Sequence, residues 1–419
     1  MARTDAVVLG AGIVGTSIAL HLAKRGLSVA LVDRGGPGEE TSYGNAGVIE
    51  GETVFPPAFP PKLWSLLRVG IKRSPEANYH IAFLPKVAPW LFSFWLASRP
   101  KKLLEFAFAM RPLFSRAVAE HEALMAEAGA LQYLRKTGWA KIYRSQKTFA
   151  AMAPELELAD QFGIPFRTLD TAGMLELEPA LKPHFARAIF WPGAASLNNP
   201  LAVTRAYVVR YQALGGVMLV GDARTLHRNG STWRVDTAEG PLDAEQAIVS
   251  LGPWAPDVLE PMGIHLPLGI KRGYHRHFEL AGSVPMTRPV VDLDNGYCVT
   301  PMQQGIRLTT GAEFADRDAG PTPVQFDRLM PKAREVYPLG EQLKEQTWLG
   351  KRPCFPDSRP VIGPAPGQKG LWLAYGHAHW GLTLGPTTGR LVADLVTGAT
   401  PFCDPAPYAA ERFLQSHAA

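Results

Sequence analysis

The feature that most constrains this chain is a glycine-rich turn directly after its first apolar run. Gly10, Gly12 and Gly15 form a GxGxxG pattern behind the run at 6–9, and Asp33 ends the next apolar run. In a βαβ unit the first glycine permits the turn, the second lets a pyrophosphate approach the backbone, and the third lets helix and sheet pack. The pattern therefore predicts a dinucleotide site in an α/β fold of Rossmann type.

The same unit predicts how the dinucleotide lies. We expect a helix over about 14–25, with Ile13 and Val14 at its positive end facing the phosphates. Asp33, with Arg34 beside it, is expected to accept hydrogen bonds from a ribose. The alternative is a glycine-rich turn without a ligand, which leaves the position of Asp33 unexplained.

Composition limits the classes of partner. The chain has 419 residues, which predicts two or three domains, and its net charge of +5 is not gathered into a block of lysine or arginine. We therefore expect no nucleic-acid partner, and attraction to small anions or an acidic membrane surface instead. Cys298, Cys354 and Cys403 are too scattered for a disulfide framework or a metal site, so a reducing cytoplasm fits best. Because glycines interrupt the first apolar stretch, we expect no secretory signal.

The pattern of elements predicts one domain interrupted twice by another. Segments 1–53, 150–265 and 347–419 contain the signals of a nucleotide-binding domain, with a helix near 200–214, strands at 217–220, 232–237, 247–252 and 371–375, and a last helix over 382–396 stopped by Gly398. Segments 54–149 and 266–346 have different sequence patterns. The first has helical spacing of apolar residues, and the second has short runs in which apolar and polar residues alternate, as in β-strands. They predict an α+β substrate-binding domain with a mainly antiparallel sheet.

One stretch, 83–102, is unusually aromatic and basic. It contains Trp90, Phe92, Phe94 and Trp95, followed by Arg99, Lys101 and Lys102. Its apolar part is interrupted by prolines and is shorter than the ~20 residues that a bilayer requires. Two interpretations remain open, a buried connection in the substrate domain and a peripheral contact with a membrane surface.

Three further motifs make a family resemblance visible. They are Glu-Thr-Ser-Tyr-Gly-Asn-Ala-Gly at 40–47, Trp-Leu-Gly-Lys-Arg-Pro at 348–353, and Gly-His at 376–377. Together with the first turn, they make the chain resemble the FAD-dependent amine oxidoreductases, the family that includes D-amino acid oxidase and glycine oxidase. Within it, the motif at 40–47 is most similar to that of bacterial D-amino acid dehydrogenases. The resemblance runs from about residue 6 to about 413 and is weakest over 54–149.

The resemblance implies FAD as cofactor and names residues for it. Beyond the first turn, it implies a loop beneath the flavin, formed by Thr41, Ser42, Asn45, Ala46 and Gly47. It implies a strand end on the adenine side, with Gly252 and Trp254. It also implies a turn whose helix N-terminus stabilises negative charge at flavin N1 and C2, with Gly376, His377, Gly381, Leu382 and Thr383. Ordinary turns, and surface or capping histidines, are the alternatives. Cys354 is similar in place to the cysteine that holds FAD covalently in sarcosine oxidases, but its spacing to Asp357 is shorter, so we expect non-covalent FAD.

The resemblance also implies a substrate site. Arg352 matches the arginine that binds the substrate carboxylate, and Tyr297 matches a tyrosine that shares it. A strand with Arg272, Tyr274, His275 and His277 is expected to line the same pocket, and His379 to border it. The alternatives are a surface ion pair for Arg352, a core strand tyrosine for Tyr297 and a surface histidine for His379.

The implied reaction is oxidative deamination of a D-amino acid, with D-proline or a hydroxyproline among the open choices. Hydride would pass from the α-carbon to flavin N5, with electrons going on to a quinone-type acceptor at the inner face of the cytoplasmic membrane. The amine must be neutral to react, and no residue in the sequence identifies itself as the group that ensures this. Two alternatives remain, an oxygen-using oxidase of glycine, sarcosine or D-amino acids, and a flavin subunit that needs a partner protein.

Overall fold

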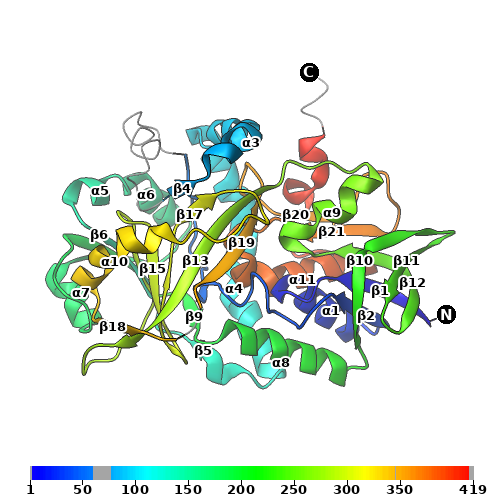
Figure 1. Ribbon diagram of the computed structural model, residues 1–419, viewed down its shortest axis with the longest axis horizontal. Helices are drawn as coiled ribbons and strands as arrows, with labels where there is room; N and C mark the ends of the chain where they lie inside the picture. Colours follow the sequence, from blue (N-terminus) through cyan, green and yellow to red (C-terminus); the bar gives the residue numbers. More distant parts are fainter. Residues whose placement is uncertain (1, 60–76, 345, 415–419) are drawn as a thin grey trace.

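The computed structural model describes residues 2–59, 77–344 and 346–414, so part of the expected 54–149 segment lies outside the described residues. Two sheets lie side by side, one at each end of the long axis (Figure 1). The α/β fold class with a Rossmann-like sheet and a mainly antiparallel second sheet is confirmed.

The seven-stranded sheet has a parallel centre. Its parallel strands follow the order β10, β2, β1, β12, β21, and β11 and β20 pair with it antiparallel. The bounds are β1 (Ala2–Leu9), β2 (Val29–Asp33), β10 (Val217–Asn229), β11 (Thr232–Thr237), β12 (Gly240–Val249), β20 (Val361–Pro364) and β21 (Leu371–Tyr375). Strands buried on both faces read as apolar runs, which is why 6–9 and 247–249 stand out in the sequence.

Four helices pack on this sheet through one apolar cluster: α1 (Ile13–Lys24), α4 (Pro100–Glu127), α8 (Pro200–Ala213) and α11 (Gly381–Thr397). Leu20, Phe114, Tyr207 and Leu391 are fully buried in it. A Cβ at Gly389 would lie 2.7 Å from the backbone of Ser17, so α1 and α11 cross at close range. The predicted helix 382–396 and its stop at Gly398 agree with α11.

The eleven-stranded sheet carries the second half of the molecule. Antiparallel pairs dominate it, with parallel pairs only at β14–β6 and β17–β4 among the described strands. The bounds are β4 (Ala77–Tyr79), β6 (Trp139–Tyr143), β7 (Arg167–Asp170), β8 (Arg187–Trp191), β13 (Gly269–Leu280), β14 (Val290–Asp292), β15 (Tyr297–Met302), β16 (Gly305–Thr309), β17 (Ala312–Phe314), β18 (Leu339–Gln342) and β19 (Trp348–Cys354). Helix α10 (Val324–Val336) covers one face through Phe326 and Leu329.

The remaining elements are short. A three-stranded sheet joins β3 (Val48–Ile49), β9 (Ala195–Leu197) and β5 (Leu134–Arg135). The other helices are α3 (Leu84–Ala97), α5 (Gln146–Ala150), α6 (Ala153–Gln161), α7 (Thr171–Leu177) and α9 (Pro256–Leu259).

Packing differs from the expected division of the chain at three places. Strands β7 and β8, expected with the nucleotide-binding segments, pair through β6 with the larger sheet. Strand β19, also expected there, pairs with β13 along its whole length. Helix α4, expected with the substrate domain, packs against α11 because its apolar stripe, including Phe114 and Met125, completes the core around α1. Strand pairing and helix docking across such separations leave no local signal in the sequence.

Helix α3 has two apolar faces. Trp90 and Phe94 are buried, whereas Phe92 and Trp95 are exposed. Among the described residues no single helix is long and apolar enough to cross a membrane. The stretches Ile81–Ala97 and Pro100–Glu127 reach that length and composition only together, across a bend of 83°.

Candidate functional site

A cavity of about 980 Å³ runs from the glycine turn to the start of α11 and on to the strands β13 and β19. Most residues predicted for the cofactor border it: Gly10, Gly12, Ile13, Val14, Asp33, Arg34, Thr41, Ser42, Asn45, Ala46, Gly252, Trp254, Gly376, His377, Gly381 and Leu382. Gly15, Gly47 and Thr383 do not. The chain therefore brings four distant sequence motifs to one cavity.

The glycine turn is built for close backbone approach. Gly10 has φ +103°, and a Cβ at Gly15 would lie 1.9 Å from the carbonyl oxygen of Gly10. Asp33 holds the turn from below, because its Oδ2 accepts from the Ala11 amide at 2.6 Å. Gly15 thus packs helix on turn, as the motif predicts, and Asp33 fixes the turn as well as bordering the cavity. These residues fit the pyrophosphate and ribose of a dinucleotide.

Beyond the turn, an aromatic ring and a guanidinium border the cavity together. The Cζ atom of Arg34 lies 4.3 Å from the ring centroid of Trp254, and Arg34 also pairs with Glu40 at 2.6 Å. A stacked guanidinium beside an indole offers flat surfaces to a purine. This end of the cavity suits the adenine side of the cofactor.

The loop 41–47 is tied to the elements around it by polar contacts. Ser42 Oγ accepts from the Ile13 amide at 3.0 Å, and Thr41 donates to the carbonyl of Lys351 at 3.0 Å. Asn45 donates to the carbonyl of His379 at 3.1 Å and accepts from the Gly47 amide at 2.8 Å. These contacts hold small residues against the cavity, which leaves room for a flat ring.

Helix α11 presents its N-terminus to the cavity. Gly381 and Leu382 open the helix, and amides in a first turn have no partner inside the helix. Thr383 does not border the cavity, because its hydroxyl donates to the carbonyl of Val48 at 3.1 Å. His377 bonds through Nε2 to the hydroxyl of Thr388 at 3.0 Å, and burial lowers its pKa to about 3, so it is a neutral core residue rather than a surface histidine.

Arg352 borders the cavity without an acidic partner. Its Nη1 donates to the carbonyl of Gly311 at 2.9 Å and its Nη2 to the carbonyl of Thr310 at 3.1 Å. The guanidinium occupies the space that a side chain at Gly273 would fill, since a Cβ there would lie 2.4 Å from Nη2. Burial lowers the pKa of Arg352 below its usual value. In the described residues no carboxylate pairs with it, which separates it from a surface ion pair.

A second cation, Lys271, lies beside it. Lys271 is the antiparallel partner of Arg352 between β13 and β19, and it also borders the cavity. Its Nζ lies 3.9 Å from the ring centroid of Phe94 and 5.1 Å from that of Trp90, both on α3. Burial and the charge of Arg352 lower the pKa of Lys271. Two cations at one wall of the cavity suit a carboxylate.

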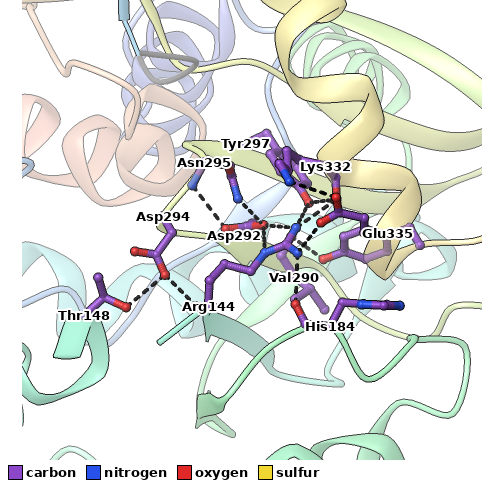
Figure 2. A network of polar contacts seen from close by, with 11 residues as sticks. Arg144, Thr148, His184, Val290, Asp292, Asp294, Asn295, Tyr297, Lys332 and Glu335 are labelled. Atoms are coloured by element: carbon purple, nitrogen blue, oxygen red, sulfur yellow. Dashed lines mark hydrogen bonds and ion pairs between the residues drawn. The ribbon is translucent and has the colours of Figure 1, made fainter. Parts of the chain in front are cut away.

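The structure corrects the expectation for Tyr297. This residue borders the cavity, but its hydroxyl donates to the carbonyl of Lys332 on α10 and lies 3.4 Å from Nη2 of Arg144 (Figure 2). Arg144 is held in turn by Asp292 at 2.7 Å and Glu335 at 2.9 Å. The hydroxyl therefore serves a network on the α10 side of the sheet, and among the described residues no hydrogen bond joins it to Arg352. The next residue along the strand, Cys298, has the phase that faces the cavity.

Of the other residues predicted to line the pocket, some border the cavity and others do not. Tyr274 borders the cavity, but its hydroxyl donates to Glu313 at 2.6 Å and accepts from Arg272 at 3.0 Å. His275 does not border the cavity, because its ring stacks on Trp348 with centroids 4.9 Å apart. Burial lowers the pKa of His275 to about 2. His379 does border the cavity, and burial together with Arg352, Lys271 and Lys141 lowers its pKa to about 3.

The cavity lining includes charged residues that sequence reasoning did not select, among them Glu50, Lys141 and Lys271. On β13, Lys271 and Gly273 face one side of the sheet, and Arg272 and Tyr274 face the other. A glycine inside a strand often marks a close approach by another group, so Gly273 was the sequence feature that could have indicated the cavity face. Glu50 follows the buried pair Val48–Ile49, so an acid at the end of an apolar run was its signal. Lys141 lies on a strand in the segment where the resemblance is weakest.

Comparisons with known proteins identify the relatives of this chain. The family model described as FAD dependent oxidoreductase (DAO) matches residues 5–395. The chain is 30% identical to a D-amino-acid oxidase of Bradyrhizobium diazoefficiens, over 97% of this chain and 98% of that protein. It is also 30% identical to a D-amino acid dehydrogenase of Rhizobium johnstonii, over 97% of this chain and 99% of that protein.

Solved structures share the fold. A glycine oxidase from Geobacillus kaustophilus superposes with a TM-score of 0.75 at 23% identity, covering 98% of this chain and 99% of that one. An L-proline dehydrogenase from P. horikoshii superposes with a TM-score of 0.77 at 18% identity, covering 99% of both chains. At these identities the likeness extends to the fold alone.

Proposed function

The chain belongs to the DAO family of FAD-dependent oxidoreductases, and on that premise we propose that it oxidatively deaminates D-amino acids and passes the electrons to a quinone-type acceptor. The coarser activity, FAD-dependent oxidation of an amino acid, follows from the family. The observation that carries the substrate class is the half-buried cation pair of Arg352 and Lys271, which has no acidic partner among the described residues and suits an α-carboxylate. The D configuration is supported by the names of the two relatives that are 30% identical.

The residues of the chain would act by binding and orientation. When bound, FAD supplies a hydride acceptor at N5 for the substrate α-carbon. Arg352 and Lys271 hold the carboxylate, which fixes the direction of the substrate in the cavity. The amides of Gly381 and Leu382 at the start of α11 stabilise negative charge near the pyrimidine end of the ring. The wall of the cavity that includes His379, on the side of Arg352 and Lys271, would keep bulk water from the reacting atoms.

Non-covalent attachment of FAD is part of the proposal. Cys354 borders the cavity, yet it is almost fully buried and its Sγ donates to the carbonyl of Arg352 at 3.5 Å. Burial raises the pKa of this thiol, and a thiol rather than a thiolate is a weak nucleophile. Release of all yellow colour into the supernatant after acid precipitation would support this assignment.

The acceptor is proposed from the surface of α3 and α4. Ile81, Phe92 and Phe108 expose 68, 60 and 62% of their surface. Exposed bases of the same region, Lys101 and Lys102, would face anionic headgroups. Such a surface suits contact with a membrane that carries quinone, at the inner face of the cytoplasmic membrane. Co-sedimentation with vesicles of anionic lipid, and its loss in Phe92→Ser with Phe108→Ser, tests the contact.

An oxygen-using oxidase is the second candidate. It is favoured by the names of two relatives, the D-amino-acid oxidase and a glycine oxidase of Pseudomonas putida that is 28% identical over 97% of this chain. Peroxide formed in step with substrate consumption would support it, whereas reduction of a soluble quinone analogue without peroxide would support the dehydrogenase.

The experiment that tests the proposal is an anaerobic screen of the flavin-loaded protein with paired D and L amino acids, proline included. We expect D-amino acids to bleach the visible absorbance band of the flavin after anaerobic mixing. L-amino acids should leave that absorbance unchanged. Bleaching by L-amino acids alone would contradict the D assignment. If no amino acid bleaches the flavin of the isolated chain, a flavin subunit that requires a partner protein becomes the better description.

A further inference from the structure

The cavity has an acidic feature that the proposed function does not use. Glu50 follows β3 and borders the cavity. One of its oxygens, Oε2, accepts from the hydroxyl of Thr53 at 2.6 Å and from the indole nitrogen of Trp380 at 3.1 Å. In the described part of the chain nothing donates to the other oxygen, Oε1. A carboxyl held on one side and free on the other is built to receive a donor from the cavity.

The groups around Glu50 come from several elements. Lys141 on β6 faces it and is already paired with Glu155 of α6 at 2.9 Å. Glu52 lies on the same loop, and the buried thiol of Cys298 on β15 also interacts with Glu50. Glu52 is bound by the indole nitrogen of Trp139 and does not border the cavity. Glu155 also borders the cavity but is paired with Lys141, whereas Glu50 borders the cavity and has no ion-pair partner among the described residues.

Glu50 is linked to the cation pair through two adjacent residues. Trp380, its indole donor, packs against the ring of His379 with centroids 4.0 Å apart. His379 in turn interacts electrostatically with Arg352, Lys271 and Lys141. The cavity therefore has a cationic wall at β13 and β19 and an acid beside α11, with His379 between them. An α-amino acid zwitterion, whose carboxylate and ammonium group are both attached to the α-carbon, matches this order of charge.

We propose that Glu50 binds the amino group of the substrate and accepts one proton from its ammonium form. This inference rests on the proposed function, since it assigns a residue to the amine of the same amino acid substrate. One N–H bond of the ammonium group breaks, its electron pair stays on nitrogen, and one O–H bond forms on Glu50. The neutral amine that results is the form from which hydride can leave the α-carbon. The proton then leaves Glu50 for solvent when product departs.

The surroundings of Glu50 suit such a transfer. Burial raises the pKa of Glu50 above its usual value, against the effects of Thr53, Lys141 and Trp380. A raised carboxyl pKa is closer to that of an ammonium group, which makes a proton transfer between them less unfavourable. Lys271, whose pKa burial and Arg352 lower, is a weaker choice as acceptor, because it lies opposite Arg352 at the end of the cavity assigned to the carboxylate. Its contacts with the rings of Phe94 and Trp90 also stabilise the ammonium form.

The first test compares two ligands that differ in the amino group. The probes are 2-aminoisobutyrate, which has no α-hydrogen to lose, and isobutyrate, which has no amine, each titrated into the flavin-loaded protein by the change in flavin absorbance. Glu50→Gln should weaken 2-aminoisobutyrate at least about tenfold and change isobutyrate little. Glu52→Gln is the matched control and should change neither. Equal effects of Glu50→Gln on the two ligands, or no effect, would overturn the proposal.

The second test follows the rate of anaerobic flavin reduction with pH. In the natural chain the rate should fall as the pH drops through the pKa of Glu50, because the protonated carboxyl cannot accept a proton. Glu50→Gln should lose that limb and slow reduction by about 100-fold, and Glu50→Asp should retain the limb. A Glu50→Gln profile that coincides with that of the natural chain would refute the assignment. Should Glu50→Gln lose FAD, the decision falls to Glu50→Asp and to whether low pH weakens 2-aminoisobutyrate, but not isobutyrate, in the natural chain.

The two levels of proposal fail differently. If no amino acid bleaches the natural chain, the proposed function fails, and the role of Glu50 fails with it. If amino acids bleach the natural chain and Glu50→Gln behaves identically, only the role of Glu50 fails.

Discussion

Lys271 lies directly opposite Arg352 in the antiparallel pairing of β13 and β19. Cross-strand partners project to the same face of a sheet, so the two cations reach the same cavity. Like charges in that position repel each other unless an anion lies between them. This arrangement supports the carboxylate role that we propose for the pair, and its two members can be tested separately.

Arg352→Ala should raise the KM for amino acid substrates by about 100-fold or more, because it removes a buried charge-assisted contact. The content of bound FAD should stay unchanged. Steady-state kinetics and the ratio of visible to ultraviolet absorbance measure the two quantities. Lys351→Met removes a charge from the same strand outside the cavity and serves as control. An unchanged KM in Arg352→Ala would refute the carboxylate assignment.

Lys271→Met keeps the length of the side chain and its contact with the rings of α3 while removing the charge. We expect the KM to rise by about tenfold, since one of two cationic contacts is lost. Competitive inhibition by a simple carboxylate such as isobutyrate should weaken by a similar factor. If inhibition is unaffected, Lys271 has a structural role under Trp90 and does not bind the carboxylate.

Tyr297→Phe separates the position seen in the structure from the role implied by the family resemblance. Its hydroxyl contacts Lys332 and Arg144 rather than the cavity wall at Arg352. We therefore expect the KM to stay within about twofold while the free energy of unfolding falls by about 1 kcal/mol, the usual cost of one lost hydrogen bond. Denaturant titration and kinetics on the same preparation measure both. A tenfold rise in KM with unchanged stability would restore the carboxylate role.

Gly15→Ala should abolish FAD binding or folding, because its Cβ would lie 1.9 Å from the carbonyl oxygen of Gly10. Gly35→Ala is the matched control, since a Cβ at Gly35 would meet nothing within 4 Å. Flavin content and the thermal midpoint of the purified proteins provide the comparison. Normal loading of Gly15→Ala would show that helix α1 can move away from the turn.

The buried carboxyl of Glu52 predicts a pH dependence of stability. Burial and the neighbouring Glu50 raise its pKa to about 8. Between its unfolded pKa and pH 8, the folded protein keeps a proton that the unfolded chain releases. Stability therefore falls as the pH rises through this window, by at most about 1.4 kcal/mol per pH unit. Glu52→Gln has no carboxyl to titrate at this position, so its Tm should rise relative to that of the natural chain as the pH increases from 5 to 8. Parallel Tm curves would contradict the assignment.

Local signals in the sequence were enough for much of the fold. The turn at Gly10 to Gly15, the helix that follows it and the acid at Asp33 form one contiguous unit, so each part supports the others. Helix α11 was equally readable, because its apolar face and the stop at Gly398 are local features.

The substrate side of the site was harder to predict, for a physical reason. Side chains alternate across a strand, so a shift of one residue moves a side chain to the opposite face. The hydroxyl of Tyr297 reaches Lys332 of α10 and that of Tyr274 reaches Glu313 of β17, whereas Lys271 has the opposite phase on β13 and its charged end borders the cavity. To predict which face of a strand borders the cavity, one must know which elements pack on each face. Helices α10 and α3 are distant in sequence from the strands they cover, so the local sequence does not reveal this. The same distance hid the pairing of β7 and β8 with the larger sheet.

The order of strands in the smaller sheet also affects how the protein is made. Strand β21 pairs with β12, and α11 packs on α1, so the first turn of the molecule is completed only by residues beyond 370. On a ribosome the N-terminal βαβ unit emerges early and must wait, unfinished, for nearly the whole nascent chain. We therefore expect flavin to bind only once translation of the chain is nearly complete.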